Sequence, residues 1–141
     1  QVVVAGEGPQ RAALQSQIEE SRAPVRLLGA RSDVGDLLRA ADVVALPSVW
    51  EARSLVAQEA LRTGVPLVTT AVGGVPELVG EAALLVPVGD AAALGDAIDR
   101  LLADPGLAAR LSELGRVQAA TWPTLEESVA ELAATYRELR G

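Results

Sequence analysis

The sequence predicts an α/β domain with a Rossmann-like parallel sheet and a helical C-terminal tail. In its first two thirds, short β-branched runs alternate with helical patterns, which is typical of parallel strands joined by crossover helices. The strand candidates are apolar without alternation, as expected for strands buried on both faces. The chain has 141 residues, of which 50% are hydrophobic, and a net charge of −7. These values fit one folded globular domain spanning residues 1–141.

Five runs are predicted to be strands: Val2 to Ala5, Val25 to Leu28, Asp42 to Leu46, Pro66 to Thr70 and Leu84 to Val86. Between the first two strands, Pro9 suits the first position of a helix. Asp33 can cap a second helix, and both helices are expected to pack on the sheet. Ser54 is the predicted N-cap of a third helix, which Gly64 would end.

The last third of the chain contains only helical patterns. Asp104-Pro105 supplies an N-cap and a first-turn proline, and Thr124 and Glu127 have the spacing of a capping box. One face of the final helix is predicted to be apolar: Leu125, Val129, Leu132, Tyr136 and Leu139.

Composition excludes several kinds of chemistry. The chain has no Cys and no His, and all 12 basic residues are Arg. It therefore lacks thiolate, imidazole and lysine chemistry, including zinc sites of the usual kind and the P-loop lysine. An acidic chain without a basic stripe is not expected to bind nucleic acid. With no apolar run of about 20 residues and no leader pattern, we expect no transmembrane segment and a cytoplasmic location.

Ligands of open parallel sheets bind at the carboxyl ends of the strands, so the loops after each strand are the places to search. Gly6-Glu7-Gly8-Pro9 is similar to the start of a dinucleotide fingerprint, but Arg11 occupies the third glycine position. We favour a tight strand-to-helix turn there. Gly73-Gly74, after the fourth strand, allows close backbone approach, and a plain turn explains it equally well.

Arg31 and Asp33 follow the second strand. They could offer a donor and an acceptor to the edge of a base. Alternatively, Asp33 only caps the next helix and Arg31 is a solvated turn residue.

Glu51 and Glu59 lie in and after the loop that follows the third strand, with seven residues between them. If the helix begins near Ser54, the unpaired amides of Leu55, Val56 and Ala57 form an anion site without lysine. Glu59 could accept hydrogen bonds from the vicinal hydroxyls of a ribose. Alternatively, Glu59 pairs with Arg62 at i+3, and Glu51 is a solvated loop carboxylate.

The chain resembles the C-terminal domain of family-four (group 1) retaining glycosyltransferases of the GT-B fold. The matching segments are V-V-V-A-G-E-G-P, V-R-L-L-G-A-R-S-D-V, A-A-D-V-V-A-L-P-S-x-W-E, A-L-R-T-G-V-P-L-V-T-T-A-V-G-G-V-P-E-L-V and L-L-V-P-V-G-D, together with the Glu51 and Glu59 pair. So many ordered matches are specific for the family, although not for a substrate.

The resemblance implies that Glu59 binds the ribose of a nucleotide-sugar donor, such as a UDP- or GDP-sugar, and that Glu51 supports the transferred sugar in catalysis. It also implies that the amides of Leu55 and Val56 face the diphosphate, and that Arg31 and Asp33 lie beside the base. Transfer of the hexosyl or related group would proceed with retained configuration, without a divalent metal or other cofactor. Catalysis would rest on positioning and on stabilising an oxocarbenium-like centre and a departing diphosphate.

Two departures from the family pattern stand out. Arg53-Ser54 replaces the usual Phe-Gly. A guanidinium is therefore expected in the donor-binding loop, where it either adds a contact to the phosphate or sugar or covers the site from solvent.

The second departure is that the strand-helix unit that normally opens the domain, with its basic phosphate ligands, is not present. In the family's strand order the missing strand would lie between the first and third strands of this chain. We therefore expect a piece of a longer bacterial enzyme, with little turnover by itself.

The missing strand has consequences for partners. The first and third strands either pair directly, or another segment or a second copy of the chain supplies the pairing through the open edge. The acceptor site is expected in an N-terminal domain of the same enzyme. The alternatives are a non-catalytic interaction module with the same half fold and, less favoured because His and Lys are absent, a GT-B epimerase or phosphorylase.

Overall fold

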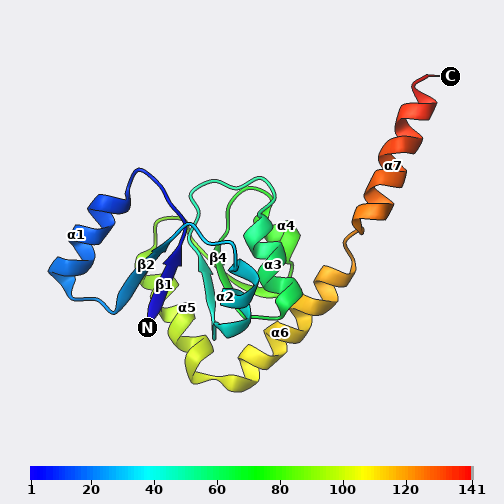
Figure 1. The fold of residues 1–141 in the computed structure, drawn as a ribbon. Coiled ribbons are helices and arrows are strands. Elements are labelled where there is room, and N and C mark those ends of the chain that lie inside the picture. The colour runs from blue at the N-terminus through cyan, green and yellow to red at the C-terminus, as the bar shows by residue number, and fades with distance from the viewer. Residues whose placement is uncertain (141) are drawn as a thin grey trace. The chain divides into compact units, whose positions relative to one another are not determined.

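The computed structural model describes residues 1–140. The chain forms two compact units, residues 1–37 and the part that begins at Leu38, and each is described by itself. The boundary between them falls within helix α2 (Val34–Ala40). Figure 1 shows the helices and strands that make up both units.

The first unit is a β-α-β arrangement of β1 (Val2–Ala5), α1 (Arg11–Ser21) and β2 (Val25–Gly29). The two strands are parallel, with Val2 opposite Val25. The expectation that β1 is buried on both faces was wrong, since all four of its residues are exposed. The physical reason is that, within the part of the chain that the structure describes, β1 pairs with β2 alone, and that α1, which has no buried residue, shields neither strand well.

The helix predicted to begin at Pro9 begins two residues later. The amide of Arg11 donates to the carbonyl of Gly8 over 3.1 Å, which closes a turn with Pro9 at its second position. Proline presets the φ angle that this turn position requires, so the same residue serves the turn instead of the helix. The N-cap of α1 is Gln10, whose side chain makes no capping hydrogen bond.

The second unit contains a parallel sheet of β3 (Val44–Leu46), β4 (Leu67–Thr70) and β5 (Ala83–Val86), in the order β3-β4-β5. All four residues of the central strand β4 are buried, whereas β3, which was also expected to be buried on both faces, has no buried residue because it lies at an edge of the sheet. The core cluster joins the sheet to two helices through Val68, Val86, Leu101 and Leu111. The helices of this unit are α3 (Leu55–Thr63), α4 (Val75–Val79), α5 (Ala91–Ala103), α6 (Pro105–Ala120) and α7 (Leu125–Glu138).

The helix boundaries of this unit follow their capping signals. Ser54 is the N-cap of α3, and Gly64 ends it in the left-handed conformation, as predicted. Asp104 caps α6, with Pro105 in its first turn. The capping box at Thr124 is also confirmed, because Thr124 and Glu127 each bond the backbone of the other.

Among residues 1–140, four strands have an edge without a strand partner: β1, β2, β3 and β5. β1 is hydrogen-bonded to β2 only, and β3 is hydrogen-bonded to β4 only. Unpaired strand edges leave backbone N–H and C=O groups available for another strand.

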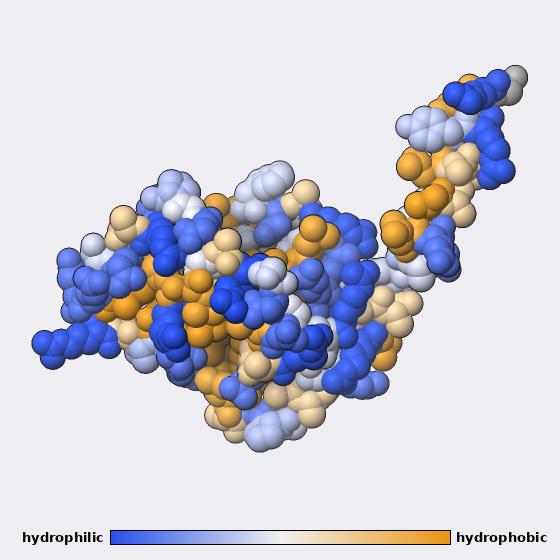
Figure 2. Space-filling model, viewed as in Figure 1, coloured by the Kyte–Doolittle hydropathy of each residue, from blue (hydrophilic) through white to orange (hydrophobic). Residues whose placement is uncertain are grey.

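Helix α7 carries the predicted apolar stripe, and that stripe faces solvent. Figure 2 shows these apolar side chains on the surface of the C-terminal helix. Leu125 and Leu139 are the most exposed, at 80% and 79%, and no residue of α7 is buried. Among residues 1–140, no helix combines the length and apolar character needed to cross a bilayer.

Candidate functional site

The loop that follows β3 is tied to the neighbouring strand β4 by two threonine side chains. Thr69 Oγ1 donates to the carbonyl of Leu46 over 3.1 Å, and Thr70 Oγ1 donates to the carbonyl of Ser48 over 2.5 Å. Both threonines are buried. These bonds fix the start of the loop at the carboxyl end of the sheet, where ligands of parallel sheets bind.

Gly73 and Gly74 allow this loop to approach the loop after β4. A Cβ on Gly73 would stand 1.7 Å from the carbonyl oxygen of Glu51, and one on Gly74 would stand 2.3 Å from that of Ala52. Gly73 also has a φ of 53°, which glycine adopts most readily. The double glycine therefore makes room for the backbone beside Glu51.

The carboxylate of Glu51 is held in place. Glu51 is half-buried, and its Oε1 accepts a hydrogen bond of 2.9 Å from Ser48 Oγ. With its backbone packed against Gly73 as well, Glu51 is an oriented carboxylate and not a freely solvated one.

The N-terminus of α3 offers two free amides. Ser54 is 3% exposed, and its Oγ accepts from the amide of Ala57 over 3.3 Å. In the described part of the chain, no hydrogen-bond partner is found for the amides of Leu55 and Val56. The sequence-based expectation of three free amides was therefore wrong for Ala57, because the cap takes its N–H. The partial positive charge of the helix end remains at Leu55 and Val56.

Glu59 lies on the exposed face of α3, one turn after Leu55. The alternative in which it pairs with Arg62 is not realised, since among residues 1–140 no ion pair of Glu59 is found. Arg62 instead stacks on Trp122, with its guanidinium carbon 5.3 Å from the ring centroid. The Glu59 carboxylate is thus available to a ligand beside the free amides.

Arg31 and Asp33, in the first unit, bind each other. Arg31 donates from Nε to one carboxylate oxygen over 2.8 Å and from Nη2 to the other over 2.5 Å. These hydrogen bonds lower the pKa of Asp33 and raise that of Arg31. Asp33 therefore uses its carboxylate for Arg31, while its backbone carbonyl accepts from the amides of Asp36 and Leu37.

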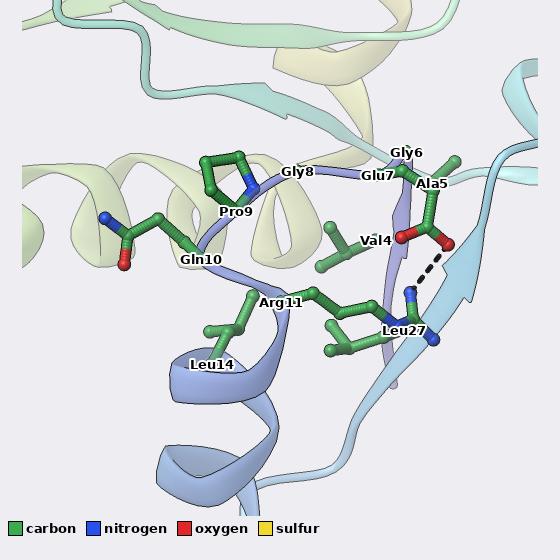
Figure 3. A pocket seen from close by; sticks show the side chains of 10 residues that line it. All are labelled: Val4, Ala5, Gly6, Glu7, Gly8, Pro9, Gln10, Arg11, Leu14 and Leu27. Carbon is green, nitrogen blue, oxygen red and sulfur yellow. Dashed lines mark hydrogen bonds and ion pairs between the residues drawn. The ribbon is translucent and has the colours of Figure 1, made fainter.

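The turn Gly6-Glu7-Gly8-Pro9 borders a cavity of about 310 Å³ in the first unit, which Figure 3 shows. Glu7 and Arg11 form an ion pair of 3.2 Å beside it, and Leu14 and Leu27 also line it. This geometry agrees with a tight strand-to-helix turn: Gly6 has a φ of 139°.

Fold and site together define this chain as a Rossmann-like half of a GT-B fold, with a helix N-terminus that leaves two amides free at the carboxyl rim of its sheet. The family model of Glycosyl transferases group 1 matches residues 1–104. The chain belongs to this family.

Curated relatives and solved structures agree with this assignment. A D-inositol 3-phosphate glycosyltransferase of Corynebacterium urealyticum is 38% identical over 130 residues, which is 89% of this chain and 30% of that protein. A sucrose-phosphate synthase structure from Thermosynechococcus elongatus has a TM-score of 0.88 at 33% identity, covering 99% of this chain and 38% of that one. Anabaena HepE in complex with UDP-glucose has a TM-score of 0.88 at 26% identity, covering 96% and 40%. The chain thus spans about a third of the length of these relatives.

The predicted site residues fall into two groups. Glu51, Arg53, Ser54, Leu55, Val56 and Glu59 share one loop and helix in the second unit, whereas Arg31 and Asp33 belong to the first unit. Sequence reasoning missed Ser48 as the partner of Glu51, although a serine three residues before a carboxylate in a loop is a recognisable signal. It also missed the contact of Trp122 with Arg62, for which the sequence holds no local signal.

Proposed function

We propose that this chain is the donor-binding part of a longer glycosyltransferase and that it binds a nucleotide-diphosphate sugar. The diphosphate would accept hydrogen bonds from the amides of Leu55 and Val56. Glu59 would bind the ribose hydroxyls, and Glu51 would face the sugar that is transferred. The observation that carries this proposal is the pair of free amides at the start of α3, with the unpaired Glu59 one turn away.

Physical chemistry supports this division of roles. A helix N-terminus favours a phosphate through its free N–H groups and its partial positive charge. A carboxylate such as Glu59 is acceptor-only and suits two neighbouring hydroxyl groups. A hydrogen bond that involves a charged group contributes about 1.5 to 3 kcal/mol.

The loop residues Arg53 and Ser54 have supporting roles in this proposal. Ser54 caps α3 and so fixes the direction of the two amides. The exposed guanidinium of Arg53 adds positive charge to the same loop. In the first unit, Arg31 and Asp33 would meet a base as one hydrogen-bonded unit, because their charged groups already bind each other.

The reaction we propose for the whole enzyme is transfer of the sugar to an acceptor with retention and without a divalent metal. An additional N-terminal domain would supply the acceptor site, and the chain by itself would have little turnover. Donor binding gains support from Anabaena HepE, a structural neighbour solved with UDP-glucose. Oriented Glu51 would stabilise positive charge that develops on the transferred sugar.

A second candidate is a non-catalytic interaction module. It is favoured by the exposed apolar stripe of α7 and by the unpaired strand edges of β1 and β3. Light scattering combined with nucleotide titration distinguishes the two. Concentration-dependent association without nucleotide binding would support the module.

Calorimetric titration with UDP and with GDP tests the donor proposal. We expect saturable binding of one nucleotide and a loss of about tenfold or more in affinity for Glu59→Ala, since about 1.4 kcal/mol corresponds to tenfold. Glu81→Ala is the matched control, because Glu81 is an exposed carboxylate that precedes β5, at the opposite end of that strand from the rim. Equal nucleotide affinity of the wild type and Glu59→Ala would contradict the proposal that Glu59 binds the ribose hydroxyls.

A further inference from the structure

We propose that the second unit has a second ligand site, which shares only Arg53 with the proposed donor site and binds a neutral polyhydroxylated ring such as a pyranose or a cyclitol. The site is a cavity of about 280 Å³ bordered by the loop after Glu51, by α4 and by the end of α6. Its functional side chains are Arg53, Glu77, Gln118, Thr121 and Trp122.

The cavity is bordered by two opposite charges that form no ion pair with each other. Arg53 and Glu77 both line it, and among residues 1–140 neither has an ion pair or a side-chain hydrogen bond. A guanidinium offers only donors and a carboxylate only acceptors. A ligand that spans them needs donors and acceptors of its own and no net charge, and hydroxyl groups meet both conditions.

The remaining walls are fixed in place. Gln118 donates from Nε2 to the carbonyl of Leu78 over 3.1 Å, which ties α6 to α4. Thr121 Oγ1 donates to the carbonyl of Gln118 over 2.7 Å, so its lone pairs are free to accept. Arg62 stacks on Trp122 and orients the indole. Polar walls that are already positioned reduce the entropic cost of binding a ligand.

The apolar part of the cavity favours a ring over an open-chain polyol. Trp122 supplies apolar surface beside the charged groups, and a sugar or cyclitol ring presents C–H groups between its hydroxyls. An aromatic side chain combines a large apolar body with a polar N–H, which suits such an amphipathic ring. The volume of about 280 Å³ lies just below the range of about 300 to 1,000 Å³ for drug-sized ligands, so it suits a single ring.

Arg53 lines this cavity, and it is also one of the two residues that replace the usual Phe-Gly of the family. The resemblance places Phe where this chain has Arg53. Phe would remove the guanidinium and place a bulky apolar ring at the cavity. The proposed site is therefore a property of this chain and of relatives that also carry a polar residue there.

The test is an NMR titration of the 141-residue chain with methyl α-D-glucopyranoside. The chain has 2 Trp residues, so Trp50 serves as an internal reference for Trp122. We expect a saturable shift of the Trp122 indole N–H signal, assigned with Trp122→Phe, and no shift of the Trp50 signal. Glu77→Gln is expected to weaken binding by about tenfold, the loss expected for a charged hydrogen bond. Glu81→Gln, an exposed carboxylate outside the cavity, is the matched control.

Several results would overturn the proposal: no saturation, equal shifts of both indole signals, unchanged binding by a folded Glu77→Gln protein, or binding of L-alanine in place of the glucoside. L-Alanine tests a zwitterion that uses the same two charges. A UDP titration of the same samples separates this site from the proposed function. If UDP fails to bind while the glucoside shifts the Trp122 signal, the donor proposal fails and this one stands. If UDP binds while the glucoside leaves the Trp122 signal unchanged, only the proposal of a second site is contradicted.

Discussion

The carbonyl oxygen of Glu51 lies where the side chain of any residue other than glycine at position 73 would begin, 1.7 Å from a Cβ built there. Two loops that follow different strands are thus in close backbone contact. The contact helps to fix the position of the Glu51 backbone. It depends on Gly73, which lies 22 positions further along the chain.

Gly73→Ala is predicted to displace the Glu51 loop, because a contact with backbone cannot be relieved by rotating a side chain. The positive φ of Gly73 adds to the cost. Urea unfolding should show a loss of stability above about 1 kcal/mol, and nucleotide affinity should fall as well. In the control Gly95→Ala, in the interior of α5, the new Cβ meets nothing within 4 Å. This variant should be more stable by up to about 1 kcal/mol.

Ser54→Ala is predicted to destabilise the chain by about 1 kcal/mol, because the amide of Ala57 loses its capping acceptor. Ser54→Gly, which restores the residue usual in the family, should cost only a few tenths of a kcal/mol. Urea unfolding of the wild type and the two variants measures both changes in the free energy of unfolding. Equal stability of Ser54→Ala and wild type would contradict the capping role.

Leu61→Ala and Leu132→Ala remove the same atoms from very different surroundings. Leu61 is 1% exposed in the core beside α6, whereas Leu132 is 58% exposed on α7. We expect a cost of about 2 to 5 kcal/mol for Leu61→Ala and about 0.5 kcal/mol or less for Leu132→Ala. A large effect at Leu132 in thermal unfolding would show that α7 packs on another surface in solution.

The pair of Arg31 and Asp33 predicts a pH dependence. The folded-state pKa of Asp33 lies below its ordinary value, chiefly because Arg31 donates hydrogen bonds to the carboxylate. The stabilisation is therefore present above the unfolded pKa of about 3.9 and is lost as pH falls through the lower folded pKa. NMR titration of the carboxyl carbon should show the pKa of Asp33 returning toward its ordinary value in Arg31→Ala. An unchanged titration in that variant would contradict the assignment.

Local signals predicted most of the fold. The caps at Ser54, Asp104 and Thr124 act over one helical turn, so the sequence alone locates these helix starts. Pro9 shows the limit, because proline suits both a helix start and the second position of a turn. The exposure of β1 could not be predicted from its apolar composition, because burial depends on neighbours that lie elsewhere in space.

The candidate site was predictable in its residue types and less so in its contacts. Glu51, Glu59 and the α3 terminus follow from one continuous segment. The contacts of Glu51 with Gly73 and of Arg62 with Trp122 join distant segments. No local pattern encodes such contacts, and one of them pairs Arg62 with Trp122 instead of Glu59.

The most direct test of the donor site is a double-mutant cycle on ribose recognition, measured by calorimetry with UDP and with its 2′,3′-dideoxy analogue on wild type and Glu59→Ala. If Glu59 accepts hydrogen bonds from the ribose hydroxyls, removing them should weaken binding to the wild type by about tenfold or more and leave binding to Glu59→Ala nearly unchanged. The same loss in both proteins would contradict the account, because the hydroxyl groups would then be recognised by something other than Glu59.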